Sequence, residues 1–159
     1  FLGWLQQAAA TATTPGLGAL SDAMLRGDTE DFGEQLEAIM VAMLSHHDLA
    51  GERVEAVYQA FLVGLLIHLQ ETHRVASNRE AGFGRADVLV VPRTPGPGAV
   101  LELKRVARRE TPEHALQRAV AQLRQRDYGA EVRAAGATTV HQYAVVFDGK
   151  RCWIERVEG

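Results

Sequence analysis

The spacing of apolar residues changes near His73, and this change limits what the chain can fold into. Between Leu17 and about Gln70, apolar residues recur every three or four positions, which is the period of helices buried along one side. After His73 the period changes to two, which is the period of β-strands. Helices first, then strands with one helix between them, predict an α/β or α+β sandwich with a mixed central sheet flanked by helices.

Three helices are expected before His73, at Leu17–Leu25, Asp31–Leu44 and Glu52 to about Gln70. The third carries a broad apolar stripe, and Glu55 falls within the arc of that stripe. A carboxylate in this position either points toward the packed interior or bends out to water from the edge of the stripe. The spacing alone leaves both alternatives open.

Five strands are expected after His73, at Arg74–Asn78, Ala86–Pro92, Ala99–Val106, Val140–Phe147 and Lys150–Val157. The Asp148-Gly149 step between the last two strands is typical of a tight hairpin. Between the third and fourth strands, Thr111 can cap a helix that starts with Pro112 and runs to about Arg126 or beyond. We therefore predict a helical extension over residues 1–50 and a core domain over residues 51–159.

Composition limits the class of protein. The chain has 159 residues, of which 47% are apolar and 23% charged, as expected for one globular domain. No apolar run approaches the ~18 residues that span a bilayer, and the single cysteine, Cys152, cannot form an internal disulfide. We therefore expect a cytoplasmic protein that does not enter a membrane. Since the chain begins at Phe1 with neither Met nor a signal layout, we also expect it to be a piece of a longer protein.

Charge is distributed unevenly along the chain. The formal net charge of −3 does not by itself favour a nucleic-acid partner, and acidic residues dominate from Leu20 to Glu55. From Lys104 to Arg126 basic residues dominate instead: Lys104, Arg105, Arg108, Arg109, Arg118, Arg124 and Arg126 accompany only Glu110 and Glu113. This basic segment either supplies contacts to phosphates or is an ordinary solvated helix and loop.

The most informative pattern joins Asp87 to Glu102 and Lys104. Side chains two apart in a strand share a face, so Glu102 and Lys104 point the same way while the leucines on either side of Glu102 point to the core. If the turn between the second and third strands is centred near Pro95, Asp87 lies opposite Glu102 or Lys104. Either register places the three charged groups on one face of the sheet.

Two carboxylates held together at a buried sheet face repel each other unless one takes up a proton or a cation neutralises them. Oxygen ligands suit Mg²⁺ or Mn²⁺, which keep several waters and readily hold a phosphate oxygen, whereas Zn²⁺ prefers His or Cys. Phosphodiester hydrolysis is therefore a candidate reaction, in which Lys104 positions or helps to deprotonate the attacking water. The plain alternative is an exposed ion pair between Glu102 and Lys104 beside a strand-entry acid, Asp87.

The complete pattern is Arg85-Ala86-Asp87, then Leu101-Glu102-Leu103-Lys104, preceded by Glu55-x-x-Tyr58-Gln59. It resembles the PD-(D/E)XK nuclease superfamily. More narrowly, with Leu25-Arg26-Gly27-Asp28, the chain is similar over most of its length to the nuclease-like domain at the C-terminus of bacterial AAA-ATPase-like proteins. Ala86 stands where the motif usually has proline, a position at which the family tolerates change.

The resemblance implies a restriction-endonuclease-like core and a metal-dependent nuclease. In it, Glu55 matches the helical acid, Asp87 and Glu102 the metal acids, and Lys104 the catalytic lysine. It further implies Mg²⁺ or Mn²⁺ as cofactor, DNA as substrate and an ATPase-like domain N-terminal to this chain.

Several residues are expected to contact nucleic acid. Gln122 and Tyr128 loosely match a Gln and a Tyr of RecB-like members, although their spacing departs from the usual three intervening residues. With the basic residues near the motif, they give the predicted contacts: Arg79, Arg85, Arg105, Arg108, Arg109, Gln122, Arg124 and Tyr128.

Two alternatives to this assignment stay open. A non-catalytic module that binds nucleic acid or protein could retain the same fold, and a toxin or defence nuclease domain of a larger protein would share the same chemistry. The intact set of Asp87, Glu102 and Lys104 favours catalysis over a binding module.

Overall fold

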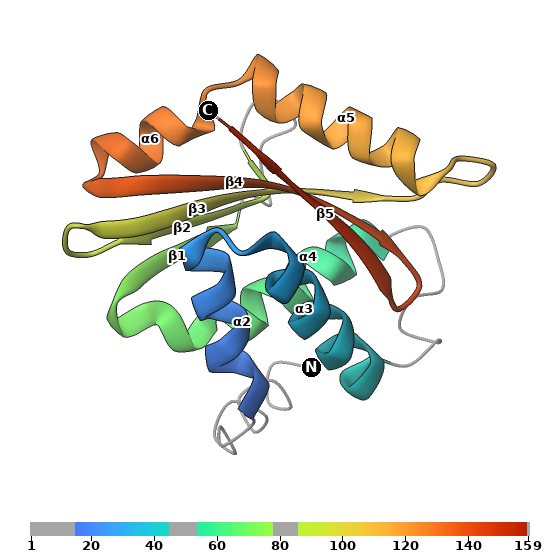
Figure 1. Cartoon of the computed structure of the whole chain (residues 1–159), viewed down its shortest axis with the longest axis horizontal. Helices are drawn as coiled ribbons and strands as arrows, with labels where there is room; N and C mark the ends of the chain where they lie inside the picture. The colour runs from blue at the N-terminus through green and yellow to red at the C-terminus, as the bar shows by residue number, and fades with distance from the viewer. Residues whose placement is uncertain (1–14, 45–53, 78–85, 159) are drawn as a thin grey trace.

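The computed structural model describes residues 15–44, 54–77 and 86–158. Its helices are α2 (Pro15–Arg26), α3 (Thr29–Met43), α4 (Val54–Leu66), α5 (Pro112–Gln125) and α6 (Tyr128–Ala134), with a 3₁₀ helix η1 (Ile67–Glu71). Its strands are β1 (His73–Ser77), β2 (Val88–Pro92), β3 (Gly96–Arg105), β4 (Ala137–Asp148) and β5 (Arg151–Val157). The predicted order of helices and strands is confirmed (Figure 1).

The five strands form one mixed sheet in the order β1-β2-β3-β4-β5. The first three strands make an antiparallel meander, β3 and β4 run parallel, and β5 returns antiparallel to β4. A parallel pair needs a crossover connection, which α5 and α6 supply. The predicted meander, crossover and final hairpin are therefore confirmed.

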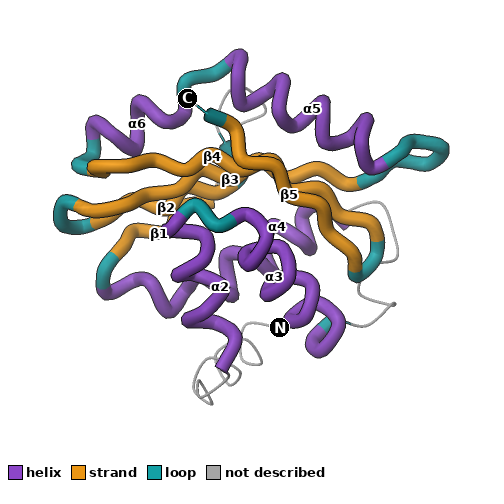
Figure 2. Tube along the Cα trace, viewed as in Figure 1, coloured by secondary structure: helices purple, strands orange, loops and turns teal. Residues whose placement is uncertain are grey.

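Helices cover both faces of this sheet (Figures 1 and 2). The helices α2, α3 and α4 lie on one face, and α5 and α6 lie on the other. Leu101 and Leu103 pack on the α2–α4 side, as expected, whereas Leu89 and Val100 pack on the α5 side. Burial on both sides explains why β2 and the centre of β3 are almost uniformly apolar. Within the described ranges, no helix is both long and apolar enough to cross a membrane.

The helices α2 and α3 share one hydrophobic core with α4 and the sheet. The hydroxyl of Tyr143 on β4 donates to the Met24 carbonyl at 2.6 Å, and Arg156 on β5 donates to the Gly27 carbonyl at 3.0 Å. Gly27 has a φ of +79°, and a Cβ atom there would lie 2.5 Å from the Arg156 guanidinium. The described part of the predicted helical extension, residues 15–44, thus completes the core, while the predicted boundary after residue 50 lies outside the described residues.

Several ends of elements differ from the predicted ones. The strand β2 starts at Val88 instead of Ala86, and β4 starts at Ala137 instead of Val140. The helix expected to reach Gln70 ends at Leu66 and continues as the 3₁₀ helix η1. The strand β3 begins at Gly96, within the expected loop, so the turn from β2 is shorter. The crossover helix ends at Gln125, because Asp127 accepts a hydrogen bond from the Ala130 N–H and caps a separate helix, α6.

Candidate active site

The pairing of β2 with β3 brings Asp87 next to Glu102. The last paired residues are Val88 and Leu101, and extending this register by one position places Asp87 opposite Glu102. Val88 and Leu101 both face the α2–α4 side, so the two carboxylates, which alternate with them, lie on the face covered by α5. Of the two predicted registers, the structure has the one that pairs the acids.

Two hydrogen bonds fix Asp87 at the start of β2. Its Oδ2 accepts the Leu103 N–H at 2.8 Å, and its carbonyl accepts a hydrogen bond from Nε2 of Gln59 on α4 at 2.8 Å. Because the β2–β3 ladder ends at Val88, the N–H of Leu103 has no backbone acceptor on β2, and it donates to the carboxylate of Asp87 instead. Asp87 is thereby held in one orientation beside β3.

Glu102 and Lys104 form a buried ion pair on β3. Glu102 is 0% exposed, and Nζ of Lys104 lies 2.6 Å from its Oε1. The second oxygen, Oε2, is buried and has no hydrogen-bond partner among the described residues. An exposed surface ion pair is therefore excluded as the explanation of this motif.

Burial and mutual repulsion disturb the titration of these groups. Burial, with the neighbouring charge of Asp87, raises the pKa of Glu102 to about 7 against the opposing effect of Lys104. Burial also raises the pKa of Asp87, although the hydrogen bond from Leu103 opposes it. Burial alone would lower the pKa of Lys104, but the hydrogen bond to Glu102 and the nearby acids outweigh it and raise the pKa. The protein without metal therefore holds a charged lysine and carboxyls that resist ionisation.

Glu55 approaches the pair from α4, one helical turn before Gln59, whose side chain is bonded to Asp87. Its side chain is exposed, so the alternative in which the carboxylate turns to water describes its surroundings better than inward packing. Partial desolvation raises the pKa of Glu55, Lys104 opposes this, and Asp87 adds to the rise. The charge of Glu55 therefore interacts with the charges of Lys104 and Asp87, while its side chain remains exposed to solvent.

The donor atoms of the strand acids fit the predicted metal. In the described part of the chain, no group of three His, Cys, Asp or Glu side chains is arranged to hold a metal ion. Asp87 and Glu102 nevertheless offer two neighbouring carboxylates, including the Oε2 atom of Glu102 noted above. Mg²⁺ commonly binds through one or two carboxylates and keeps several waters. Glu55 as a third ligand stays a prediction.

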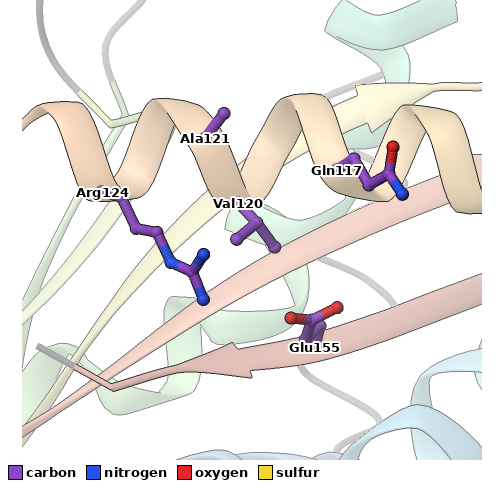
Figure 3. Close-up of a pocket in the computed structure, with 5 residues that line it drawn as sticks. All are labelled: Gln117, Val120, Ala121, Arg124 and Glu155. Carbon is purple, nitrogen blue, oxygen red and sulfur yellow. The ribbon is translucent and has the colours of Figure 1, made fainter.

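The two flanks of α5 face different parts of the sheet. A pocket of about 300 Å³ separates α5 from β5 and is lined by Gln117, Val120, Ala121, Arg124 and Glu155. Figure 3 shows Arg124 and Glu155 directed into this space. Arg118 and Gln122 each lie two residues from Val120, hence about 160° around the helix from it. This flank of α5 is turned away from β5, toward β3 and β2. Asp87 and Glu102 are found beside those two strands.

The predicted nucleic-acid contacts divide into several groups. Arg105, Arg108 and Arg109 are exposed at the end of β3 and in the following turn, and Gln122 is half-buried on the flank of α5 nearer the acids. Arg124 is exposed but lines the pocket beside β5. Arg79 and Arg85 lie outside the described residues.

Tyr128 is 5% exposed and packs in the core between the sheet, α5 and α6. This burial is at odds with the predicted contact to nucleic acid. The physical reason is the break between α5 and α6, which turns the first residue of α6 inward instead of leaving it on a continuous exposed helix.

Two contacts near the site were not predicted. Tyr58 donates to the Gly149 carbonyl at 2.7 Å and stacks on Phe147 with ring centres 4.2 Å apart, which ties α4 to the β4–β5 hairpin. Glu110 forms a bidentate pair with Arg118. These partners are 91 and 8 residues apart in sequence, so no local pattern signals either contact.

Comparison with known proteins gives one family. Residues 53–157 match the PD-(D/E)XK nuclease superfamily, which covers the α4 helix, all five strands and both crossover helices. Neither the curated proteins nor the solved structures gave a match. With the matched segment extending over more than half of the sequence, the chain belongs to the PD-(D/E)XK nuclease superfamily.

Proposed function

We propose that this chain hydrolyses DNA phosphodiester bonds with Mg²⁺ or Mn²⁺. The observation that supports this most is the placement of Asp87 opposite Glu102, with Lys104 paired to one oxygen of Glu102 and no partner described for the other. A buried carboxylate pair with raised pKa values is costly to the fold. A site that exists to bind a divalent cation accounts for that cost.

In the proposed site Asp87 and Glu102 hold the cation, and Glu55 contacts it directly or through water. When bound, the cation would lower the pKa of a water molecule and offset charge on the phosphate. Lys104 remains protonated because its pKa is raised, so its role is to orient the attacking water and to stabilise negative charge that develops on the phosphate. The ion pair with the buried Glu102 holds the side chain of Lys104, which is 15% exposed, in one position.

The basic residues at the end of β3 are proposed to contact the DNA backbone. Arg105, Arg108 and Arg109 are exposed there, at the last position and in the following turn of the strand that carries Glu102 and Lys104. Arg109 adopts a φ of +68° in the turn that follows. Phosphate contacts of this kind give affinity without sequence preference.

A cleavage assay tests the function. Supercoiled plasmid and linear duplex DNA would be incubated with the chain in Mg²⁺, Mn²⁺ or chelator, beside Asp87→Ala and, as a charge-matched control, Glu131→Ala on the exposed face of α6. Cleavage is expected with metal, and with Glu131→Ala, but not with chelator or Asp87→Ala. Tight DNA binding by the unchanged chain with no cleavage in either metal would favour the non-catalytic binding module instead.

We further propose that an ATPase-like domain works together with this nuclease domain. The support is the resemblance that includes Leu25-Arg26-Gly27-Asp28, which spans the end of α2 and the turn that leads to α3. The DNA-cleavage assay repeated on a protein that joins this chain to an ATPase-like domain, with and without ATP, would test whether nucleotide changes the rate. An equal rate under both conditions would count against this partnership.

A further inference from the structure

Arg118 on α5 is held along one edge and open along the other. Its Nε and Nη2 atoms donate to the two carboxylate oxygens of Glu110, at 2.8 and 3.0 Å. In the portion of the chain that the structure describes, its third nitrogen, Nη1, has no hydrogen-bond acceptor, and the side chain is 42% exposed. A guanidinium fixed in this way keeps one N–H of Nη1 and the second N–H of Nη2 free as a parallel pair at a set position.

Glu110, which holds Arg118, is itself fixed. Its side chain is only 9% exposed, and it accepts the Ala107 N–H at 2.8 Å while Nδ1 of His114 lies 2.8 Å from its Oε1. These contacts join the turn after β3 to the first part of α5. Hydrogen bonds from Arg118 also lower the pKa of Glu110 to about 2, so the carboxylate stays ionised at ordinary pH.

The open edge of Arg118 belongs to the flank of α5 that is turned away from β5. The pocket lined by Val120 and Glu155 marks the β5 flank, and Arg118 lies about 160° around the helix from Val120. The flank that carries Arg118 therefore lies on the side of α5 toward β3 and β2, the strands beside which Asp87 and Glu102 are found. In agreement, burial raises the pKa of Glu55, and the charge of Arg118 is one of those that oppose this rise.

We propose that Arg118 binds a phosphate of the DNA strand beside the Asp87–Glu102 pair, and that Glu110 is the residue that positions it. A planar guanidinium with two parallel N–H groups matches the oxygens of a phosphate, and it needs no reorganisation when its other edge is already held. The inference rests on the proposed nuclease function, because it assigns one contact of the substrate in that site.

Binding measured over a range of salt concentrations tests the contact. A labelled duplex oligonucleotide with Ca²⁺ would be titrated with the unchanged chain and with Arg118→Gln, Arg118→Lys and Arg133→Gln. The logarithm of the affinity falls linearly as the logarithm of the salt concentration rises, and each phosphate that the protein neutralises makes this fall steeper by about 0.9. Arg118→Gln should make the slope less steep by about that amount and weaken binding about tenfold. Arg118→Lys should keep most of the slope because it keeps the charge.

Arg133 gives the matched control, since it is an exposed arginine on α6 that also pairs with one carboxylate, Asp127. Arg133→Gln removes the same charge and should leave the slope unchanged. An equal loss of slope in Arg118→Gln and Arg133→Gln, or no loss in either, would overturn the phosphate contact.

Glu110→Gln separates positioning from charge. Removing a negative charge should by itself tighten DNA binding. If Glu110 positions Arg118, the cleavage rate of bound DNA should nevertheless fall, by about tenfold. A Glu110→Gln protein that binds more tightly and cuts at the parent rate would contradict the positioning role.

These outcomes are distinct from failure of the nuclease proposal. A parent chain that binds the duplex but never cuts it would refute the nuclease, while the slope comparison would still decide whether Arg118 contacts phosphate. A parent chain that binds no DNA would overturn both.

Discussion

The ammonium of Lys104 lies 2.6 Å from one oxygen of Glu102, and no described residue bonds the other oxygen of that buried carboxylate. The lysine offsets only part of the cost of ionising this acid, because burial and the neighbouring charge of Asp87 still raise the pKa of Glu102 to about 7. This arrangement is unfavourable for the fold alone, and it leaves one buried oxygen of Glu102 without a described partner, on the residue opposite Asp87.

Without metal, the stability of the protein should fall as pH rises from about 4.5 to 7. The pKa of Glu102 is higher in the folded state than in the unfolded chain, so the folded state binds more protons over this interval and loses stability as they dissociate. Thermal unfolding in chelator at pH 5 and pH 8 measures the effect. The Glu102→Gln protein should lose less stability between these two pH values than the parent, and an identical pH dependence would show that Glu102 is not the titrating group.

Added Mn²⁺ or Mg²⁺ should raise the melting temperature at pH 8, because a ligand that binds only the folded state stabilises it. At a metal concentration a hundredfold above the dissociation constant the gain is about 2.7 kcal/mol. The Asp87→Ala, Glu102→Ala double variant should lose this gain, while Glu131→Ala should retain it. A metal-dependent shift of equal size in the double variant would place the metal elsewhere.

Glu55→Gln should slow metal-dependent cleavage, by about tenfold, with little change in melting temperature. The side chain is exposed, so removal of its charge leaves the packing of α4 intact, while a ligand or water contact of the cation is lost. Glu34→Gln on α3, also exposed, is the control for loss of one helical charge. Cleavage at the parent rate would mean that Glu55 is only a solvated residue at the edge of the apolar stripe.

Gly27→Ala should destabilise the protein by more than about 1 kcal/mol. The residue has a φ of +79°, and a Cβ atom would meet His141 as well as Arg156, at 2.7 and 2.5 Å. Gly18→Ala within α2 is the matched control, since its Cβ would have no neighbour within 4 Å and alanine favours a helix. Chemical denaturation of both variants compares them. If Gly27→Ala were as stable as Gly18→Ala, the docking of the α2–α3 turn on β4 and β5 would contribute nothing to the fold.

Patterns of short range predicted much of this fold. The alternation in Leu101–Lys104 indicates which side chains share a face, and the Thr111 cap and the Asp148-Gly149 step mark the start of α5 and the last hairpin, as observed. These features depend on neighbouring residues only. The register of β2 against β3 could be narrowed to two choices because the turn between the strands was expected to be centred near Pro95.

Features that depend on tertiary contacts could not be predicted. The exposure of Glu55 follows from where α4 meets the start of β2, which the helical period does not encode. Tyr128 is buried because the chain bends between α5 and α6, a break set by the Asp127 cap. The Glu110–Arg118 pair depends on the path of the turn after β3, where Arg109 adopts a positive φ.

Separate measurements of DNA binding and cleavage by Lys104→Met test the central claim most directly. Methionine keeps most of the aliphatic stem but removes the ammonium that lies 2.6 Å from Glu102. With Ca²⁺, the affinity for duplex DNA should fall only modestly, because one positive charge among several is lost. With Mg²⁺, the turnover of bound DNA should fall by roughly 10²-fold or more, as expected when a preorganised charge is removed from the transition state. Collapse of binding with turnover of the bound DNA at the parent rate would contradict the account.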